Sequence, residues 1–189
     1  MRRVTKAYQA LQDRNNPDEV ESHGPYKCER ADAWLGEGYY FWETFIDNAH
    51  WWGNSHYEDE YIICEAEFDF DDDRCFDLAG NTQHMQEFQQ ILTLLKEQGL
   101  IDSNTSIGRV IRYLQNQNLF QYEACRVTSP QSRKLNSDYN KPTPIGKANN
   151  SYTVHLQPPF QICFYSSHSL NLRNYKVIYP EQYREGYGV

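Results

Sequence analysis

Apolar and polar side chains alternate most clearly between Tyr61 and Phe70. In this segment every second residue is apolar, and the residues between them become acidic after Ile63. A period of two predicts a β-strand that lies with one face on the core and the other in water. The apolar face carries Ile62, Cys64, Ala66, Phe68 and Phe70, and the wet face carries Glu65, Glu67 and Asp69.

Two later segments have apolar residues at intervals of three and four, which is the spacing of one helix face. The first of these helices is expected to end at Gly99, because glycine readily adopts the backbone conformation that follows a helix. A shorter helix is expected after Thr44, whose hydroxyl can cap it, and Gly53-Asn54 should stop it. The apolar stripes are Met85, Phe88, Ile91, Leu92 and Leu95 in the first helix, Ile107, Val110, Ile111 and Leu114 in the second, and Phe45, Ala49 and Trp52 in the shorter one.

The remaining segments are less regular. Residues 1–22 predict a short polar helix followed by a loop. Aromatic and β-branched runs predict short strands at Gly38–Trp42, Phe160–Tyr165 and Tyr175–Tyr179. The polar stretch Ser129–Asn150 contains three prolines and predicts a long mobile loop. Strands, then helices, then strands without regular alternation favour an α+β fold.

Composition narrows the class of protein. The 189 residues suit one domain, and the absence of a membrane-length apolar run predicts a cytoplasmic protein with no membrane partner. A formal charge of −8 disfavours broad binding to phosphate backbones, although a local basic patch is compatible with it. The five cysteines are dispersed, odd in number and without a Cys-x-x-Cys pair, which argues against a disulfide framework and a zinc site. We therefore expect no metal.

The stretch Trp34–Glu43 is the densest in candidate chemistry. Gly36 and Gly38 allow the backbone to pass close to another group, and Tyr40 and Trp42 point to the same side of a strand. A tyrosine ring stacks well on a flat cation such as nicotinamide, through apolar contact and cation–π attraction. The alternative interpretation is a turn that enters a buried strand.

His23-Gly24 adds a second element upstream, where the histidine can donate a hydrogen bond to a ribose hydroxyl and the glycine leaves room for a ligand. An exposed loop is the alternative. Taken in order, three motifs resemble the ADP-ribosyltransferase superfamily of the diphtheria toxin and poly-ADP-ribose polymerase type. They are His23-Gly24, Gly36-Glu37-Gly38-Tyr39-Tyr40 and Ala49-His50-Trp51-Trp52.

The match is most similar to a bacterial group of small uncharacterised proteins that carry Trp-Leu-Gly-x-Gly-x-Tyr-Phe-Trp-Glu, a pattern found at Trp34–Glu43. Later segments of this chain that resemble the same group are Ile63–Asp69, Cys75–Leu78 and Phe160–Cys163. The resemblance implies one domain over residues 1–189, with residues 1–21 as an N-terminal extension. It also implies a split β-sandwich, in which two small, mostly antiparallel sheets flanked by helices enclose an NAD⁺ cleft.

The resemblance also implies roles in binding NAD⁺, which is the substrate in this superfamily. The Tyr40 ring would stack on nicotinamide, and His23 would hold the adenosine-side ribose or a neighbouring group of NAD⁺. The residues that would line the rest of the site are Gly24, Gly36, Gly38 and Tyr39. Arg126, and also Arg30, could grip the diphosphate, because guanidinium pairs well with phosphate; ordinary surface arginines are the alternative.

A glutamate of the superfamily usually hydrogen-bonds the nicotinamide ribose, and this chain has Gln161 at the similar position of its late strand. Gln161 is therefore the first candidate for that role, and Glu43 is the second, although strand alternation places Glu43 opposite Tyr40. The resemblance implies a mono-ADP-ribosyltransferase of toxin or phage-defence type, with a protein or nucleic-acid acceptor, and it is compatible with an inhibitory partner. The alternatives are an inactive module that binds NAD⁺, ADP-ribose or a protein, and an NAD⁺ glycohydrolase.

Overall fold

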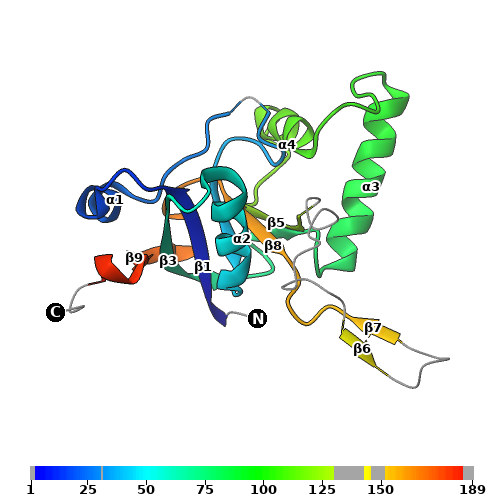
Figure 1. Cartoon of the computed structure of the whole chain (residues 1–189). Helices are drawn as coiled ribbons and strands as arrows, with labels where there is room; N and C mark the ends of the chain where they lie inside the picture. Colours follow the sequence, from blue (N-terminus) through cyan, green and yellow to red (C-terminus); the bar gives the residue numbers. More distant parts are fainter. Residues whose placement is uncertain (1–2, 31, 130–142, 146–151, 185–189) are drawn as a thin grey trace.

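The computed structural model describes residues 3–30, 32–129, 143–145 and 152–184, and it is built around one seven-stranded sheet (Figure 1). The strands of that sheet are β1 (Arg3–Gln12), β2 (Tyr39–Glu43), β3 (Tyr61–Phe70), β4 (Cys75–Asp77), β5 (Ala124–Thr128), β8 (Phe160–Phe164) and β9 (Arg173–Tyr179). The helices are α1 (Pro17–His23), α2 (Ile46–Tyr57), α3 (Thr82–Glu97) and α4 (Ile107–Asn116).

The strand order is β4-β5-β8-β2-β1-β3-β9, so the two ends of the sheet are built from different parts of the chain. All neighbouring strands pair antiparallel except β4 and β5, which are parallel. Together with the helices this confirms the expected α+β class. The seven strands form one hydrogen-bonded sheet, whereas the resemblance implied two small ones.

The first strand corrects the sequence prediction for the N-terminus. A polar helix was predicted there, but Arg3–Gln12 forms β1, which lies between β2 and β3. Thr5, Ala7, Tyr8 and Gln9 are all buried, because this strand is covered on both faces. Burial on both faces removes the period of two from the sequence, and the alternation used for β3 could not identify this strand. The expected N-terminal extension thus supplies a central strand.

α2 covers one face of the sheet and is longer than predicted (Figure 1). It packs its buried Ala49 against Tyr8, Trp42 and Ile63 of three adjacent strands. The helix continues through Gly53, which was expected to stop it. A Cβ at this glycine would meet the Tyr61 ring, so the glycine serves close packing. Thr44 does not cap the helix either, because Phe45 occupies the N-cap position and no side chain caps it.

The two amphipathic helices α3 and α4 are confirmed. The Asn81 side chain accepts hydrogen bonds from the N–H groups of Gln83 and His84 in the first turn of α3, and the Ser106 side chain accepts one from the N–H of Arg109 in the first turn of α4. Their buried residues form one cluster with β4, β5 and β8, although Met85 of α3 is exposed. The other sheet face buries a second cluster, which includes Phe41, Phe68, Ile162 and Phe164.

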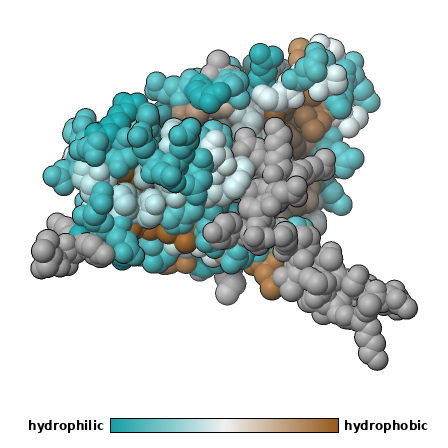
Figure 2. All heavy atoms as spheres, viewed as in Figure 1, coloured by the Kyte–Doolittle hydropathy of each residue, from teal (hydrophilic) through white to brown (hydrophobic). Residues whose placement is uncertain are grey.

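On the side shown in Figure 2, hydrophilic residues dominate the described surface, and apolar residues appear as patches between them. In the described part of the chain, no helix is long and apolar enough to cross a membrane. Most of the predicted loop Ser129–Asn150 lies outside the described residues. Within it, Thr143–Ile145 forms β6, which pairs antiparallel with β7 (Tyr152–Val154).

Candidate functional site

β1 and β2 separate near the centre of the sheet. The described ladder between them consists of the pairs Ala7–Glu43 and Tyr8–Trp42, while β1 continues in register with β3 as far as Gln12. Beyond Tyr8 the two strands diverge, and a cavity of about 580 Å³ lies beside the opening. We call it the Tyr40 cavity; the sheet residues that line it are Gln9, Ala10 and Leu11 of β1, Tyr40 and Trp42 of β2, and Gln161 of β8.

Aromatic rings surround the Tyr40 cavity. Trp52 from α2 lies 6.2 Å from Trp42 between ring centroids, and the His56 ring is stacked on Trp52 at 3.6 Å. The volume falls within the range of about 300–1,000 Å³ that is usual for small-molecule sites. The arrangement suits a ligand with flat rings. The rings that line the cavity come from Tyr26, Trp34, Tyr40, Trp42, Trp52 and Tyr57.

The Tyr40 hydroxyl is engaged by its own turn. It donates a hydrogen bond to the Gly36 carbonyl at 2.7 Å and accepts one from the Leu35 N–H at 3.0 Å. Burial raises the pKa of Tyr40 well above its usual value, so the hydroxyl stays protonated at neutral pH. The hydroxyl therefore holds the turn, and the ring is the part of this residue that a ligand can contact.

Gln161 lies at the base of the cavity with a fixed orientation. Its Oε1 accepts a hydrogen bond from the Trp34 indole N–H at 2.9 Å. An indole nitrogen can only donate, so this contact identifies the oxygen of the Gln161 amide and leaves its NH₂ group for other partners. Gln161 thus offers hydrogen-bond donors to a ligand, where a glutamate would offer acceptors.

Gln9 organises the Tyr40 cavity, although no pattern in the sequence predicts this role. Its Nε2 donates to the Tyr26 carbonyl at 2.8 Å, and its Oε1 accepts from the Tyr26 N–H at 3.0 Å and the Tyr175 hydroxyl at 2.8 Å. These bonds tie the segment that forms one wall of the cavity to β1. A lone glutamine in an unrecognised strand carries no sequence signal for this role.

Three predicted site residues lie on the opposite face of the sheet. Tyr39 packs against the second buried cluster, the one that includes Phe41, as the alternation of β2 requires. Glu43 is 2% exposed and forms ion pairs with Arg126 and, at 3.3 Å, with Arg3. Arg126 is itself buried and also donates to both carboxylate oxygens of Asp77, at 3.0 and 3.1 Å. Neither Glu43 nor Arg126 faces the Tyr40 cavity, because both are committed to this buried ion network.

His23 and Gly24 lie at the end of α1, away from the lining of the Tyr40 cavity. The exposed His23 ring contacts the Ser22 hydroxyl and the Glu19 carbonyl through Nδ1, each at 3.0 Å. Gly24 packs against the Tyr175 ring, which occupies the space that a Cβ would need. The structure therefore does not bring this pair together with Tyr40 and Gln161.

Gly36 and Gly38 shape the turn that precedes Tyr40. Gly36 has φ of +90°, a conformation that disfavours other residues, and it packs against Gly108 of α4. Gly38 lies so close to Cys163 and to the Phe164 carbonyl that a Cβ would be 2.5–2.6 Å from them. Both glycines therefore serve the close approach of backbone segments, and Gly36 also lines a second cavity on the far side of the turn.

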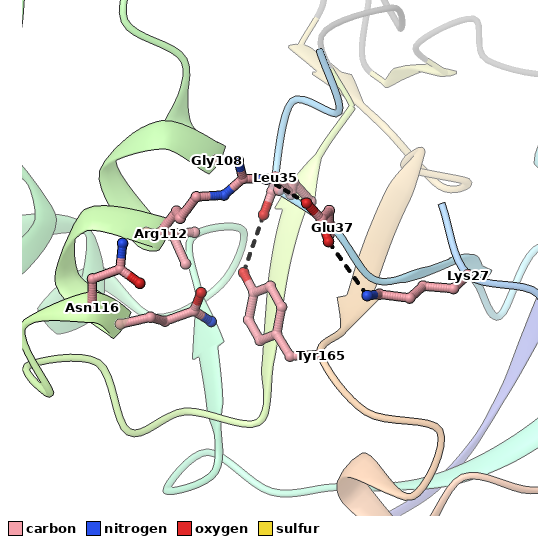
Figure 3. A pocket seen from close by; sticks show the side chains of 10 residues that line it. Lys27, Leu35, Glu37, Gly108, Arg112, Asn116 and Tyr165 are labelled. Carbon is pink, nitrogen blue, oxygen red and sulfur yellow. Dashed lines mark hydrogen bonds and ion pairs between the residues drawn. The ribbon is translucent and has the colours of Figure 1, made fainter. Parts of the chain in front are cut away.

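This second cavity, which we call the Arg112 cavity, has a volume of about 330 Å³ and lies between α4 and the turn (Figure 3). Glu37 stands between two cations there, with Arg112 at 2.9 Å and Lys27 at 3.4 Å. The Tyr165 hydroxyl donates to the Leu35 carbonyl at 3.3 Å. The same turn thus separates two cavities of different character.

The mouth of the Tyr40 cavity carries mixed charge. Arg30 and Asp32 form a bidentate ion pair at 2.7 and 2.9 Å, and this pair raises the pKa of Arg30 and lowers that of Asp32. Both side chains are strongly exposed, so the pair adds little to stability. Lys27 and Glu29 also reach this cavity. Of the two arginines predicted to bind the diphosphate, Arg30 lies at the Tyr40 cavity and Arg126 does not.

Within the described residues, no group of three or more His, Cys, Asp or Glu side chains is arranged to hold a metal ion. Comparisons with known proteins add no relative, because no family model, curated protein or solved structure matches the chain.

Proposed function

We propose that the Tyr40 cavity binds NAD⁺ and that the chain is an ADP-ribosyltransferase-like protein. In its active form it would transfer ADP-ribose to a protein or nucleic-acid acceptor, as a toxin or defence protein with an inhibitory partner. One observation carries the proposal: the motif on which the family resemblance rests places the Tyr40 ring at an aromatic cavity where the central strands diverge.

The ligand contacts follow from the geometry. The pyridinium ring of NAD⁺ would stack on Tyr40, since a cation is attracted to the face of an aromatic ring. Trp52 and Trp34 offer further rings for the second heterocycle or the riboses. Arg30 at the mouth can reach the diphosphate if it leaves Asp32, and the NH₂ group of Gln161 can donate to a ribose or carboxamide oxygen.

Quenching of tryptophan fluorescence by NAD⁺ tests the binding, because three tryptophans line the cavity. We expect saturable quenching of the wild-type protein and an affinity at least about tenfold lower for Tyr40→Leu, equal to roughly 1.4 kcal/mol. Tyr40→Phe, which keeps the ring, should bind within about threefold of wild type, a difference of less than 1 kcal/mol.

Tyr39→Leu is the matched control, since Tyr39 is the adjacent residue on the opposite sheet face. It should leave the NAD⁺ affinity unchanged. Circular dichroism verifies that each variant is folded. Equal affinities of folded Tyr40→Leu and wild-type protein would reject the site.

A second candidate function is favoured by Gln161. The Trp34 indole fixes the Gln161 amide so that it presents donors, and the carboxylates that line the cavity, Glu29 and Asp32, are both exposed at its mouth. In the described residues, the cavity thus lacks the buried carboxylate that would stabilise an oxocarbenium-like transition state. This observation favours a protein that binds NAD⁺ or ADP-ribose without turnover.

Gln161→Glu distinguishes the two functions, because a carboxylate can still accept the Trp34 hydrogen bond and brings negative charge to the cavity. If the wild-type protein is a silent binder, the variant should release nicotinamide at least about 10²-fold faster, the usual scale for one electrostatic group. If it is a transferase, labelled NAD⁺ and a cell lysate should already give a labelled macromolecule with the wild-type protein. Free ADP-ribose formed by the pure protein alone would instead identify a glycohydrolase.

A further inference from the structure

The Arg112 cavity is distinct from the Tyr40 cavity in its chemistry. It is lined mainly by polar side chains, whereas rings line the Tyr40 cavity. Five of its lining residues lie on one face of α4, at intervals of three and four, so the helix directs them together. These residues are Gly108, Ile111, Arg112, Gln115 and Asn116.

The Arg112 cavity is lined by two cationic side chains and one carboxylate. Arg112 and Lys27 each donate a hydrogen bond to Glu37, one to each of its oxygens. Lysine has three N–H donors and arginine has five, so both retain donors after this contact. One positive charge is left without compensation in a concave site, although the whole chain carries −8.

The neutral lining residues complete the chemistry. Gln115 and Asn116 bring amide groups to the wall of the cavity. The apolar residues Leu35 and Ile111 are fully buried beneath it, so they offer almost no apolar surface to a ligand. A volume of about 330 Å³ leaves room for more than a single oxyanion. The site therefore fits an anion that carries further hydroxyl groups.

We propose that the Arg112 cavity is a second ligand site, which binds a small phosphorylated polyhydroxy compound such as a sugar phosphate. Arg112 and Lys27 hold the phosphate group, since guanidinium and ammonium groups both pair with phosphate oxygens. Gln115 and Asn116 hydrogen-bond the hydroxyls. Glu37 holds the two cations in place and competes with the ligand for them (Figure 3). Lys27 lines both cavities, but the contacts proposed for the phosphate do not require NAD⁺ in the Tyr40 cavity.

Calorimetric titration with ribose 5-phosphate, inorganic phosphate and ribose tests the site. We expect ribose 5-phosphate to bind, inorganic phosphate to bind more weakly, and ribose to give no measurable binding. Arg112→Gln should lower the affinity for ribose 5-phosphate at least about tenfold, the usual scale for a hydrogen bond to a charged group. Glu37→Gln should raise this affinity about threefold or more, because the competing carboxylate is removed.

Arg109→Gln is the matched control, because Arg109 lies one turn from Arg112 on α4, is exposed and does not line the cavity. Its affinity should stay within about twofold of wild type, since only long-range charge is changed. Equal losses in Arg109→Gln and Arg112→Gln would overturn the proposal in favour of non-specific attraction. Weaker binding by Glu37→Gln, or no binding of ribose 5-phosphate to the wild-type protein, would also overturn it.

Discussion

The two faces of β2 and β8 place polar residues in different environments. On one face Gln161 lies beside an open cavity, with one side of its amide held by Trp34. On the other face Glu43 is closed into an ion network with Arg126. Glu43 follows directly after Trp42, which lines the cavity, so one step along the strand separates the two environments. The comparison teaches that the face of a strand, more than the residue type, decides whether a polar group can meet a ligand.

Mutation of the closed face, which carries the Glu43–Arg126 network, should lower the free energy of unfolding the most. Arg126→Leu removes the cation between Glu43 and Asp77 and leaves two buried carboxylates. Among the described ion pairs, Glu43 then keeps only its contact with the exposed Arg3. Breaking a buried pair in this way costs about 3–5 kcal/mol. Urea denaturation should show this fall in the free energy of unfolding.

Arg30→Leu removes an ion pair from the exposed mouth and serves as the comparison for Arg126→Leu. It should change the free energy of unfolding by no more than about 1 kcal/mol. If the two variants lose equal stability, the distinction between a closed and an open face is wrong.

A loss well below that of Arg126→Leu is expected from Gln161→Leu on the cavity face. The substitution removes the acceptor of the Trp34 indole, but the cavity admits water that can replace it. We expect a loss of about 1 kcal/mol or less in the free energy of unfolding, measured in the same urea titration. A loss as large as that of Arg126→Leu would mean that the cavity is dry and closed.

The last effect concerns the Tyr40 hydroxyl and develops only at high pH. Burial raises the pKa of this hydroxyl in the folded protein above the usual value of 10.0. Its contribution to stability is therefore complete below pH 10 and is lost as pH rises above it, because the unfolded chain ionises first. Tyr40→Phe lacks this group, so the difference in unfolding free energy between wild type and variant should shrink above pH 10. A difference that stays constant to pH 11 would contradict the burial of the hydroxyl.

Several features of the fold were accessible from the sequence because they leave a periodic pattern. Strand β3 was predicted by its alternation, and α3 and α4 were predicted by their apolar stripes. The same alternation placed Glu43 opposite Tyr40, as the structure confirms. Strand β1 was missed because burial on both faces erases the pattern.

The candidate site was accessible only in part. Tyr40 and Gln161, which the glycine-aromatic motif and the late strand singled out, line the same cavity, and their roles in binding NAD⁺ stay a prediction. The place of Arg126 depends on the pairing of β5 with its parallel neighbour β4, which brings Asp77 to it, and long-range pairing of this kind leaves no local signal. The role of Gln9 depends on its contact with Tyr26, seventeen positions away along the chain.

The most direct measurement is a crystal structure of the protein grown with NAD⁺. The account predicts the dinucleotide in the Tyr40 cavity, with its pyridinium ring in contact with the Tyr40 ring at about 4 Å. NAD⁺ bound at another surface, with the Tyr40 cavity holding only solvent, would contradict the central claim.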